Sequence, residues 1–442
     1  MSSSALFADL YEFTMLRAYF ELGMNAPATF SLFVRNIPPQ RNFLIAAGLD
    51  DLLQEIEHLR FEPQHIDYLG SLKIFSEPFL DWLADFRFSG DIHAMHEGTP
   101  FFENEPILEV VAPIAEAQLI ETLVLNQIGL QTILASKAAR VVAAARGASV
   151  VDFGARRAQG LDAATKGARA FYIAGVESTS NVAAGQAYGL PVAGTMAHSF
   201  VEACASESDA FQSFAEVFPD TTLLVDTCDT IEGVQKVVAL AKARGTNFKV
   251  RAVRLDSGDL DMLSRETRRI LDEAGLTDVQ IVASGGLEET KIDALTSRGA
   301  PIDVFGVGTD MAVSSDAPTL DIAYKLTEYA GEGRMKLSTG KRSLPGRKQV
   351  FRQVEDGVAV SDVIAREGET VPGVPLLEPY MLSGVRTAQS CDLSQIRAYA
   401  KEQLAALPAY LKALGSHEAR YDVAISRELS EYERETRARL ID

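Results

Sequence analysis

The fold is decided by residues 249–286, which read KVRAVRLDSGDLDMLSRETRRILDEAGLTDVQIVASGG. Residues 249–255 and 280–284 are short runs rich in β-forming residues, which predicts two strands. Between them, residues 259–274 have the periodicity of a helix. A strand–helix–strand unit predicts two parallel strands that are joined by a right-handed crossover.

The same pattern extends from about residue 148 to residue 310. Further strand-like runs lie at 148–153, 171–174, 191–196, 222–226 and 302–307, and a second helix-like run lies at 230–244. Strands that alternate with helices predict the α/β class, here a closed or nearly closed TIM-like α/β barrel. An open, doubly wound sheet is the alternative.

Polar residues follow these runs at matching positions. The clusters are Gly154 to Arg157, Ser178 to Asn181, Thr195 to His198, Asp226 with Thr227, Asp256 to Asp259, Ser284 to Gly286 and Gly306 to Asp310. The carboxyl ends of barrel strands meet at one mouth, where the active sites of such barrels form. The clusters therefore predict a single active site.

The two ends of the chain have a different pattern. Helical runs are expected at 5–22, 118–146, 393–413 and 424–440, and strands at 28–35 and 106–113. We expect residues 1–120 and 331–442 to pack together as an accessory α+β domain built from both chain termini. Residues 121–330 would then form the barrel that carries the active site.

Charge and cysteine content exclude some classes of function. The formal net charge is −19, which argues against a binder of nucleic acid or of anionic membranes. A small anionic substrate needs only a local cluster of positive groups. The three cysteines, Cys204, Cys228 and Cys391, lack metal-type spacing and indicate a reducing cytoplasm. No signal peptide or transmembrane segment is expected.

Two glycine-rich turns follow late strands, Ser284-Gly285-Gly286 and Gly306-Val307-Gly308-Thr309. Glycine lets backbone N–H groups come close to a phosphate, and paired turns after the last strands are the usual phosphate site of these barrels. The alternative is that both are ordinary strand-to-helix turns.

Three titratable residues stand out at predicted strand ends. His198 can be a nucleophile, a base or a packed loop residue. Asp226 and Asp256 end adjacent strands, where carboxylates hold Mg²⁺ or accept bonds from ribose hydroxyls. Helix N-capping is the alternative for the aspartates, with Asp229 the better capping candidate.

Basic residues at strand ends can bind an anion in this acidic chain. Arg156 and Arg254 have guanidinium forks that bind carboxylates and phosphates through two parallel bonds. The basic run TGKRSLPGRK, at residues 339–348, either covers a pyrophosphate or is a solvated loop.

Ten segments, in the same order over nearly the whole chain, resemble nicotinate phosphoribosyltransferases. They are DLYEFTM (9–15), FSLFVRNIP (30–38), VVDFGARRAQG (150–160), GVESTSNVAAG (175–185), GTMAHSF (194–200), VDTCDT (225–230), VRLDSGDL (253–260), ASGGL (283–287), VFGVGTDM (304–311) and KRSLPGRKQVFR (341–352). The resemblance implies an irregular α/β barrel shared with quinolinate and nicotinamide phosphoribosyltransferases. It also implies a homodimer whose active sites are completed by the partner subunit.

The implied reaction joins nicotinate to phosphoribosyl pyrophosphate and yields nicotinate mononucleotide and pyrophosphate, with Mg²⁺ and coupled ATP hydrolysis, in NAD salvage. Such an enzyme is classed as a ligase. The alternatives are a nicotinamide or quinolinate phosphoribosyltransferase of the same fold, or a non-catalytic ligand-binding homologue. A barrel isomerase or aldolase would need a strand-end base or lysine, and Lys166 is the only nearby candidate.

The resemblance implies residue roles. His198 is similar to the histidine that ATP phosphorylates, and Phe153 and the neighbouring subunit's Tyr11 are similar to the pair that encloses the pyridine ring. The other implied contacts are Arg156, Thr195 and Arg254 at the ring and its carboxylate, Asp256 near the ribose, Gly285, Gly286, Gly308 and Thr309 at the 5′-phosphate, and Arg35, Lys341 and Lys348 at the pyrophosphate.

Ser180 bears on the choice of base. The related nicotinamide enzymes have an Asp at the position that aligns with Ser180, where it can accept a bond from an amide. A carboxylate there would repel nicotinate, whereas a neutral Ser with Arg nearby suits it.

Overall fold

The computed structural model describes residues 4–338, 343–387, 392–415 and 420–441. The chain divides into two compact units. We name Leu134–Pro318 the barrel unit, and Met1–Ile133 together with Thr319–Asp442 the accessory unit. Among the described residues, no helix combines the length and the apolar composition that crossing a membrane requires.

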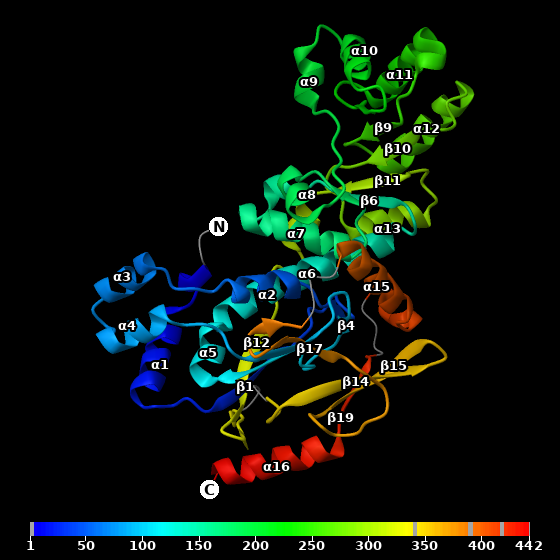
Figure 1. Ribbon diagram of the computed structural model, residues 1–442. Helices are drawn as coiled ribbons and strands as arrows, with labels where there is room; N and C mark the ends of the chain where they lie inside the picture. Colours follow the sequence, from blue (N-terminus) through cyan, green and yellow to red (C-terminus); the bar gives the residue numbers. More distant parts are fainter. Residues whose placement is uncertain (1–3, 339–342, 388–391, 416–419, 442) are drawn as a thin grey trace. The chain divides into compact units, whose positions relative to one another are not determined.

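The barrel unit is built on a six-stranded sheet in the order β7-β6-β11-β10-β9-β8, in which all paired strands are parallel (Figure 1). The strands are β6 (Ser149–Asp152), β7 (Ser178–Thr179), β8 (Thr222–Leu224), β9 (Ala252–Leu255), β10 (Gln280–Ala283) and β11 (Val304–Val307). The predicted α/β architecture is therefore confirmed, in the form of a half barrel whose edges are β7 and β8.

Helices lie between these strands along the chain, and α14 follows the last of them. They are α7 (Leu161–Ile173), α8 (Val182–Tyr188), α9 (His198–Ala203), α10 (Glu207–Val217), α11 (Thr230–Arg244), α12 (Leu260–Glu273), α13 (Glu289–Ser297) and α14 (Thr309–Val313). Helix α11 packs closely against the end of β8. A Cβ at Gly233 would lie 2.2 Å from the carbonyl oxygen of Val225, so only glycine allows this approach. The helices predicted at 230–244 and 259–274 are confirmed.

Two predicted strands are wrong. Residues 171–174 contain the end of α7, where Phe171 and Ile173 are both buried. A short apolar run cannot be assigned to strand or buried helix by periodicity alone. Residues 191–196 form an extended segment in which Val192 makes a single bridge with Thr179.

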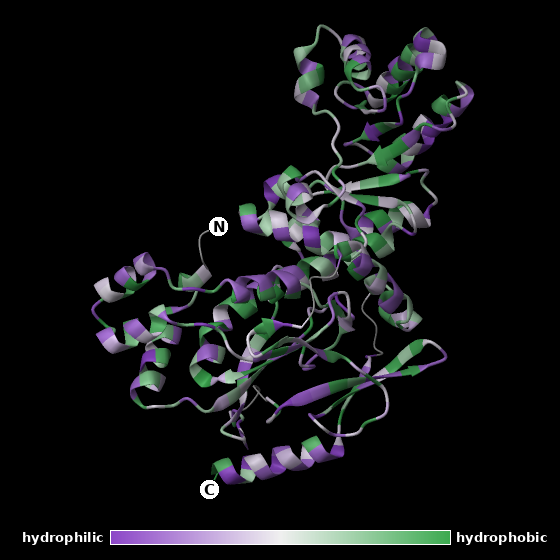
Figure 2. Cartoon of the chain, viewed as in Figure 1, coloured by the Kyte–Doolittle hydropathy of each residue, from purple (hydrophilic) through white to green (hydrophobic). Residues whose placement is uncertain are grey.

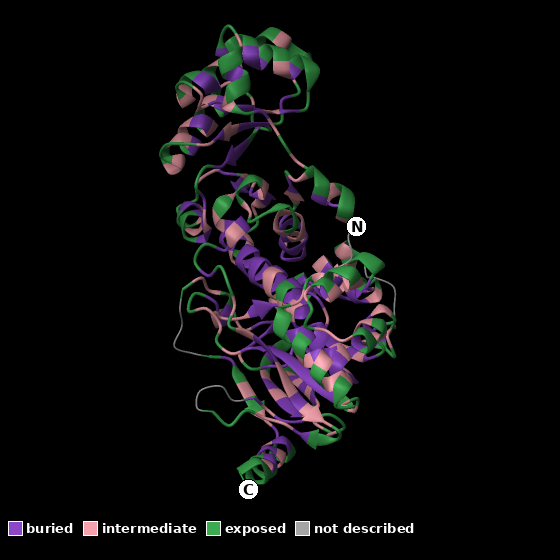
Figure 3. Cartoon of the chain, turned by 90° about the vertical axis from the view of Figure 1, so that its left-hand side faces the viewer, coloured by how far each residue is buried: buried purple, intermediate pink, exposed green. Residues whose placement is uncertain are grey.

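The accessory unit contains a seven-stranded sheet in the order β13-β12-β1-β5-β3-β17-β18. Its strands are β1 (Pro27–Val34), β3 (Asp91–Met95), β5 (Leu108–Pro113), β12 (Ile322–Tyr329), β13 (Glu332–Gly333), β17 (Leu377–Leu382) and β18 (Val385–Arg386). Strand β1 pairs in antiparallel fashion with β5 and with β12, so both ends of the chain build one sheet. Figure 3 shows much of this sheet in the colour of buried residues. An accessory α+β unit made from both termini is therefore confirmed.

Two smaller sheets complete the accessory unit. One contains β14 (Lys348–Glu355), β15 (Val358–Arg366), β16 (Val374–Pro375) and β19 (Asp422–Ile425), and the other pairs β2 (Leu44–Ile45) with β4 (Pro100–Phe101).

The helices of the accessory unit are α1 (Leu10–Glu21), α2 (Leu49–Glu57), α3 (Pro63–Ser71), α4 (Glu77–Ala84), α5 (Ile114–Leu119), α15 (Leu393–Ala405) and α16 (Arg427–Ile441), with α6 (Glu121–Ala144) running on into the barrel unit. Edge-to-face and tilted aromatic pairs, such as Phe13 with Phe61 and Phe20 with Trp82, fill the space between α1 and α4 and their neighbours. Helix α16 is largely hydrophilic in Figure 2, but its Leu429 is fully buried.

Candidate active site

A cavity of about 480 Å³ lies at the carboxyl ends of the barrel-unit strands. Both predicted glycine-rich turns line it, together with Phe153, Arg156 and Asp256. The strands that precede these groups, β6, β9, β10 and β11, are adjacent in the sheet. The parallel register therefore brings groups that are distant in sequence to one mouth, as the strand pattern predicts.

The first glycine turn requires glycine. Gly285 has φ +91°, and a Cβ there would lie 1.8 Å from the carbonyl oxygen of Asp256. Gly286 has φ +60°. The preceding Ser284 donates its hydroxyl to Asp256 Oδ1 at 2.5 Å. The turn is thus bonded to the end of β9, and its backbone N–H groups are not shielded by side chains.

The second turn provides room for an aromatic ring. A Cβ at Gly306 would lie 2.5 Å from the ring of Phe153, and glycine therefore allows that ring to rest on β11. Gly308 and Thr309 follow at the start of α14 and line the same cavity. The ring and the second turn are thus adjacent.

Arg254 connects the ring to polar groups. Its Cζ lies 5.9 Å from the centre of the Phe153 ring, and its Nη1 donates to Thr195 Oγ1 at 2.8 Å. Burial lowers the pKa of Arg254, and the carboxylate of Asp256, 3.9 Å from Nη2, opposes that shift. A guanidinium remains charged in proteins, so a cation lies beside a flat apolar ring.

His198 lies at the start of α9. Its Nδ1 is 3.1 Å from Thr227 Oγ1, and its Nε2 is 3.9 Å from Asp256 Oδ2. Its side chain is 39% exposed. The imidazole is therefore held at one nitrogen, while the other faces a carboxylate and can be reached from solvent.

The two aspartates at strand ends are not helix caps. Asp229 and Asp259 cap α11 and α12. Asp226 accepts the backbone N–H of Asp256 at 3.1 Å and the hydroxyl of Ser257 at 2.5 Å through Oδ2. Its other oxygen, Oδ1, is buried and has no hydrogen-bond partner, which is the state expected of a ligand atom.

No group of three His, Cys, Asp or Glu residues that could hold a metal ion occurs within the described residues. Mg²⁺ at phosphate sites usually takes one or two protein carboxylates, and substrate phosphates and waters complete its coordination. Asp226, with its unpartnered oxygen, fits that kind of site.

Two further cations line the cavity: Arg157, which belongs to a predicted strand-end cluster but was given no role, and Lys291, which the sequence analysis does not single out. Arg157 is exposed beside Arg156 on the loop after β6. Lys291, in the first turn of α13, donates from Nζ to the carbonyl oxygen of Gly286 at 2.7 Å. Its position five residues after Gly286 was a usable signal. The lining thus includes cations that can bind an anionic substrate, beside the carboxylates of Asp256, Glu288 and Asp310.

Asp152 was also missed. It is buried at the end of β6, and its two oxygens accept bonds from the N–H of Gly154 and the hydroxyl of Thr179, each at 2.7 Å. Burial raises its pKa. The backbone N–H of Ser180, whose residue is exposed, donates to Asp152 O at 2.8 Å. Asp152 therefore joins the loop that carries Phe153 to the loop that carries Ser180.

The remaining candidates belong to the accessory unit. Tyr11 lies on α1 and is 46% exposed, and burial together with Glu121 raises its pKa. Arg35 pairs with Asp321 at 3.1 Å. Lys348 is buried, with Nζ 3.0 Å from Glu109 Oε1. Lys341 lies outside the described residues. The structure thus gives Arg35 and Lys348 carboxylate partners within their own unit.

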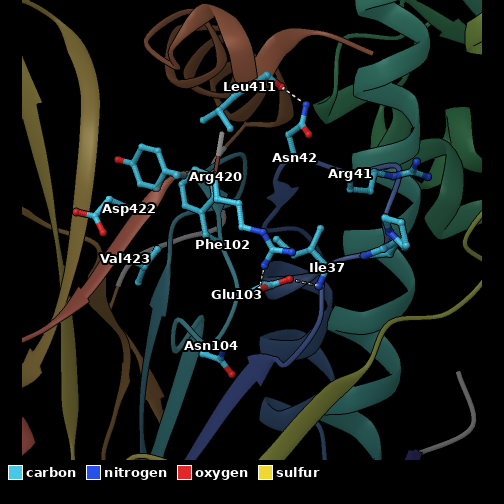
Figure 4. Close-up of a pocket in the computed structure, with 13 residues that line it drawn as sticks. Ile37, Arg41, Asn42, Phe102, Glu103, Asn104, Leu411, Arg420, Asp422 and Val423 are labelled. Carbon is cyan, nitrogen blue, oxygen red and sulfur yellow. Dashed lines mark hydrogen bonds and ion pairs between the residues drawn. The ribbon is translucent and has the colours of Figure 1, made fainter. Parts of the chain in front are cut away.

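A second cavity, of about 410 Å³, lies in the accessory unit (Figure 4). Its polar groups bind one another. Glu103 accepts from Arg420 at 3.5 Å and from the N–H of Ile37 at 3.1 Å, and Asn42 donates to Leu411 O at 3.0 Å. Figure 4 shows the side chain of Arg41 directed away from that pair. None of the candidate residues in the described part of the chain lines this cavity.

Two family models match the chain. The nicotinate phosphoribosyltransferase N-terminal domain matches residues 6–129, and the quinolinate phosphoribosyl transferase C-terminal domain matches residues 134–325. Among solved structures, human nicotinic acid phosphoribosyltransferase is similar, with a TM-score of 0.86 and 28% identity over 96% of this chain and 99% of that chain.

Curated relatives are more similar in sequence. Nicotinate phosphoribosyltransferase pncB2 of Mycobacterium tuberculosis is 55% identical over 96% of this chain and 91% of its own length. Nicotinate phosphoribosyltransferase of Bacillus subtilis is 40% identical over 79% of this chain and 73% of its own length. The chain belongs to the nicotinate phosphoribosyltransferase family.

Proposed function

We propose that this protein forms nicotinate mononucleotide and pyrophosphate from nicotinate and phosphoribosyl pyrophosphate, as a step in NAD salvage. The observation that carries the proposal is one cavity lined by the ring of Phe153 and by both glycine turns, with the cation of Arg254 5.9 Å from the centre of that ring. These are partners for an aromatic ring, a carboxylate and a phosphate. The relatives, named for nicotinate, do not favour nicotinamide or quinolinate as the substrate.

Nicotinate would bind with its ring on Phe153 and its carboxylate toward Arg254 and Arg156. Arg254 is already oriented by Thr195 at 2.8 Å, which fixes one nitrogen and lets the fork approach an anion. Guanidinium–carboxylate pairs are short, directional and often bidentate. A guanidinium–carboxylate pair of this kind would favour the binding of nicotinate over nicotinamide, which has no carboxylate.

In the transfer step, the pyridine nitrogen donates its lone pair to the anomeric carbon while the bond from that carbon to the pyrophosphate oxygen breaks. The base needs no proton removed, and positioning and charge stabilisation therefore supply the catalysis. Asp256 stands where its carboxylate can offset positive charge that develops on the ribose. Asp226 would hold Mg²⁺ through Oδ1, and the ion, when bound, supplies positive charge to the leaving pyrophosphate.

We also propose that ATP phosphorylates His198. In the tautomer with a proton on Nδ1, that N–H would donate to Thr227 Oγ1, 3.1 Å away, and the Nε2 lone pair would form the phosphorus–nitrogen bond as the terminal phosphoryl group leaves ADP. Water later breaks that bond and regenerates the imidazole. Coupling of this kind would favour product formation and place the enzyme among ligases.

Assembly as a homodimer is the third part of the proposal. Tyr11, Arg35, Lys341 and Lys348 would then act from a partner subunit. For Lys348 this role requires that its ion pair with Glu109 opens. A cytoplasmic location stays a prediction from the cysteine content.

One assay tests the reaction and the phosphohistidine together. Initial rates with nicotinate, phosphoribosyl pyrophosphate and Mg²⁺ are measured with and without ATP for the parent, for His198→Ala and for the control His58→Ala. His58 is an exposed histidine at the end of α2. ATP should stimulate the parent and the control but not His198→Ala. Equal stimulation of all three would refute the role of His198. Turnover of nicotinamide without turnover of nicotinate would refute the choice of base.

A further inference from the structure

A buried lysine lies behind the two glycine turns. Lys137 Nζ, on α6, is 2.5 Å from Glu289 Oε2, 2.6 Å from Asp310 Oδ2 and 3.0 Å from Asp316 Oδ1. Its side chain is 2% exposed. An ammonium has three N–H donors, and here three carboxylates surround it. A buried charge of this kind requires close pairing of good geometry.

The three carboxylates come from the segments that follow the turns. Glu289 is the first residue of α13, just beyond the Gly285 and Gly286 turn. Asp310 is the second residue of α14, just beyond Gly308, and Asp316 follows that helix. One ammonium therefore forms ion pairs with the beginning of α13 and with the beginning of α14, and each of these helices follows a glycine turn.

Neighbouring bonds stiffen the same network. Arg140 Nε lies 3.0 Å from the second oxygen of Glu289, and Ser315 donates its hydroxyl to Asp310 Oδ1. Asp310 and Ser315 line the cavity, whereas the lining does not include Lys137. The lysine can thus act on a ligand only through the groups that it holds.

We propose that Lys137 is a positioning residue for recognition of the substrate's 5′-phosphate. By bonding Glu289 and Asp310 together, it fixes the spacing of the two glycine turns whose N–H groups would bind the phosphate. Its charge also neutralises carboxylates that would otherwise repel a phosphate from behind. This inference rests on the proposed function, because it assumes that the phosphate occupies these turns.

The test compares two ligands that differ only in the phosphate. Kd is measured by calorimetry for nicotinate mononucleotide and for nicotinate riboside, on the parent and on Lys137→Met. We expect Kd for the mononucleotide to rise about 10- to 100-fold, because displacing binding groups by about 1 Å has effects of that size. Kd for the riboside should change less than about threefold.

Three further variants make the test decisive. Lys236→Met removes another lysine–glutamate pair of the barrel unit, Lys236 with Glu207 at 2.8 Å, and should bind both ligands normally. If Lys137→Met fails to fold, Lys137→Met with Glu289→Gln keeps the net charge of the cluster and should show the same selective loss. Gly285→Ala reports whether the phosphate occupies the turn at all.

The outcomes separate this inference from the proposed function. A normal Kd for the mononucleotide in the Lys137 variants, with a weakened one in Gly285→Ala, would overturn the positioning role alone. A normal Kd in Gly285→Ala would overturn the phosphate site itself. Equal weakening of both ligands in the Lys137 variants would assign Lys137 to general stability, and would also overturn the inference.

Discussion

The barrel unit and the accessory unit carry their candidate residues in opposite ways. In the barrel unit, Phe153 and Asp256 directly follow parallel strands and line one cavity, and Arg254, within β9, lies beside both of them. In the accessory unit, strand β1 pairs with β12, so that Ala28 lies opposite Tyr329, and the antiparallel sheet defines no shared mouth. There, the candidates Arg35 and Lys348 are bonded to Asp321 and Glu109.

The difference has a physical origin. Parallel strands all end at one edge of their sheet, so residues at strand ends come together whatever their distance in the sequence. Antiparallel strands alternate in direction, so their ends do not gather at one edge of the sheet. A cation that is buried within such a unit needs a carboxylate partner from the protein itself. A basic residue in the sequence therefore predicts a binding role in the barrel unit far better than in the accessory unit.

The largest expected effect is at the first glycine turn. Gly285→Ala should lower kcat/KM by at least about 1,000-fold, or about 4 kcal/mol, because the new methyl group would meet the carbonyl of Asp256. Steady-state kinetics with varied phosphoribosyl pyrophosphate measure it. Gly299→Ala is the control, because Gly299 also has a positive φ but nothing lies within 4 Å of its Cβ position. Equal losses in both variants would refute a special role for the turn.

The next largest effect concerns Lys348 in the accessory unit. Lys348→Met should cost about 3–4 kcal/mol of unfolding free energy, because it leaves the fully buried Glu109 carboxylate without its cation. Urea unfolding measures the loss. Lys325→Met, which removes a half-exposed partner 3.7 Å from Glu121, should cost less than about 1 kcal/mol. Unchanged stability with a raised KM for phosphoribosyl pyrophosphate would instead place Lys348 on the pyrophosphate.

A pH effect is expected on α1. Burial raises the pKa of Glu12 from 4.5 to about 7, although Thr122 donates two bonds to one oxygen. Between these values Glu12 keeps its proton in the folded chain and loses it in the unfolded chain, so the contribution of Glu12 to stability falls as pH rises from about 4.5 to about 7 and stays low above it.

Glu12→Gln should remove this slope and raise the unfolding free energy by about 2 kcal/mol at pH 8. Urea titrations at pH 5 and pH 8 measure both quantities. Glu402→Gln, on the exposed side of α15, should leave the slope unchanged. A slope that persists in Glu12→Gln would contradict the assignment to Glu12.

The smallest expected effect is on the choice of base. Ser180→Asp should lower kcat/KM for nicotinate about fivefold, because a carboxylate near an acidic substrate repels it. The residue is exposed, which limits the effect. Ser180→Asn, which adds no charge, is the control, and kinetics with nicotinate and nicotinamide measure both. A loss of equal size in Ser180→Asn would show that shape, not charge, matters at this position.

The residues that line the barrel-unit cavity could be predicted from the sequence better than the buried residues that hold them in place. Predicted strand-end residues such as Phe153, Asp256 and Gly285 line one cavity, because each closely follows a strand of the parallel sheet. The helical end of α7 could not be distinguished from a strand, because Phe171 and Ile173 suit either. Lys137 lies in the apolar helix α6, and only the packing of α6 against α13 and α14 shows what it holds. Asp152 binds the N–H of Gly154 and the hydroxyl of Thr179, and only the pairing of β6 with β7 brings Thr179 to it.

The most direct test of the account is a crystal structure of the enzyme with nicotinate mononucleotide. We predict the pyridine ring on Phe153, its carboxylate bonded to Arg254, and the phosphate bonded to backbone N–H groups of Gly285, Gly286, Gly308 and Thr309. A phosphate bound away from both glycine turns, or a ring that does not contact Phe153, would contradict it.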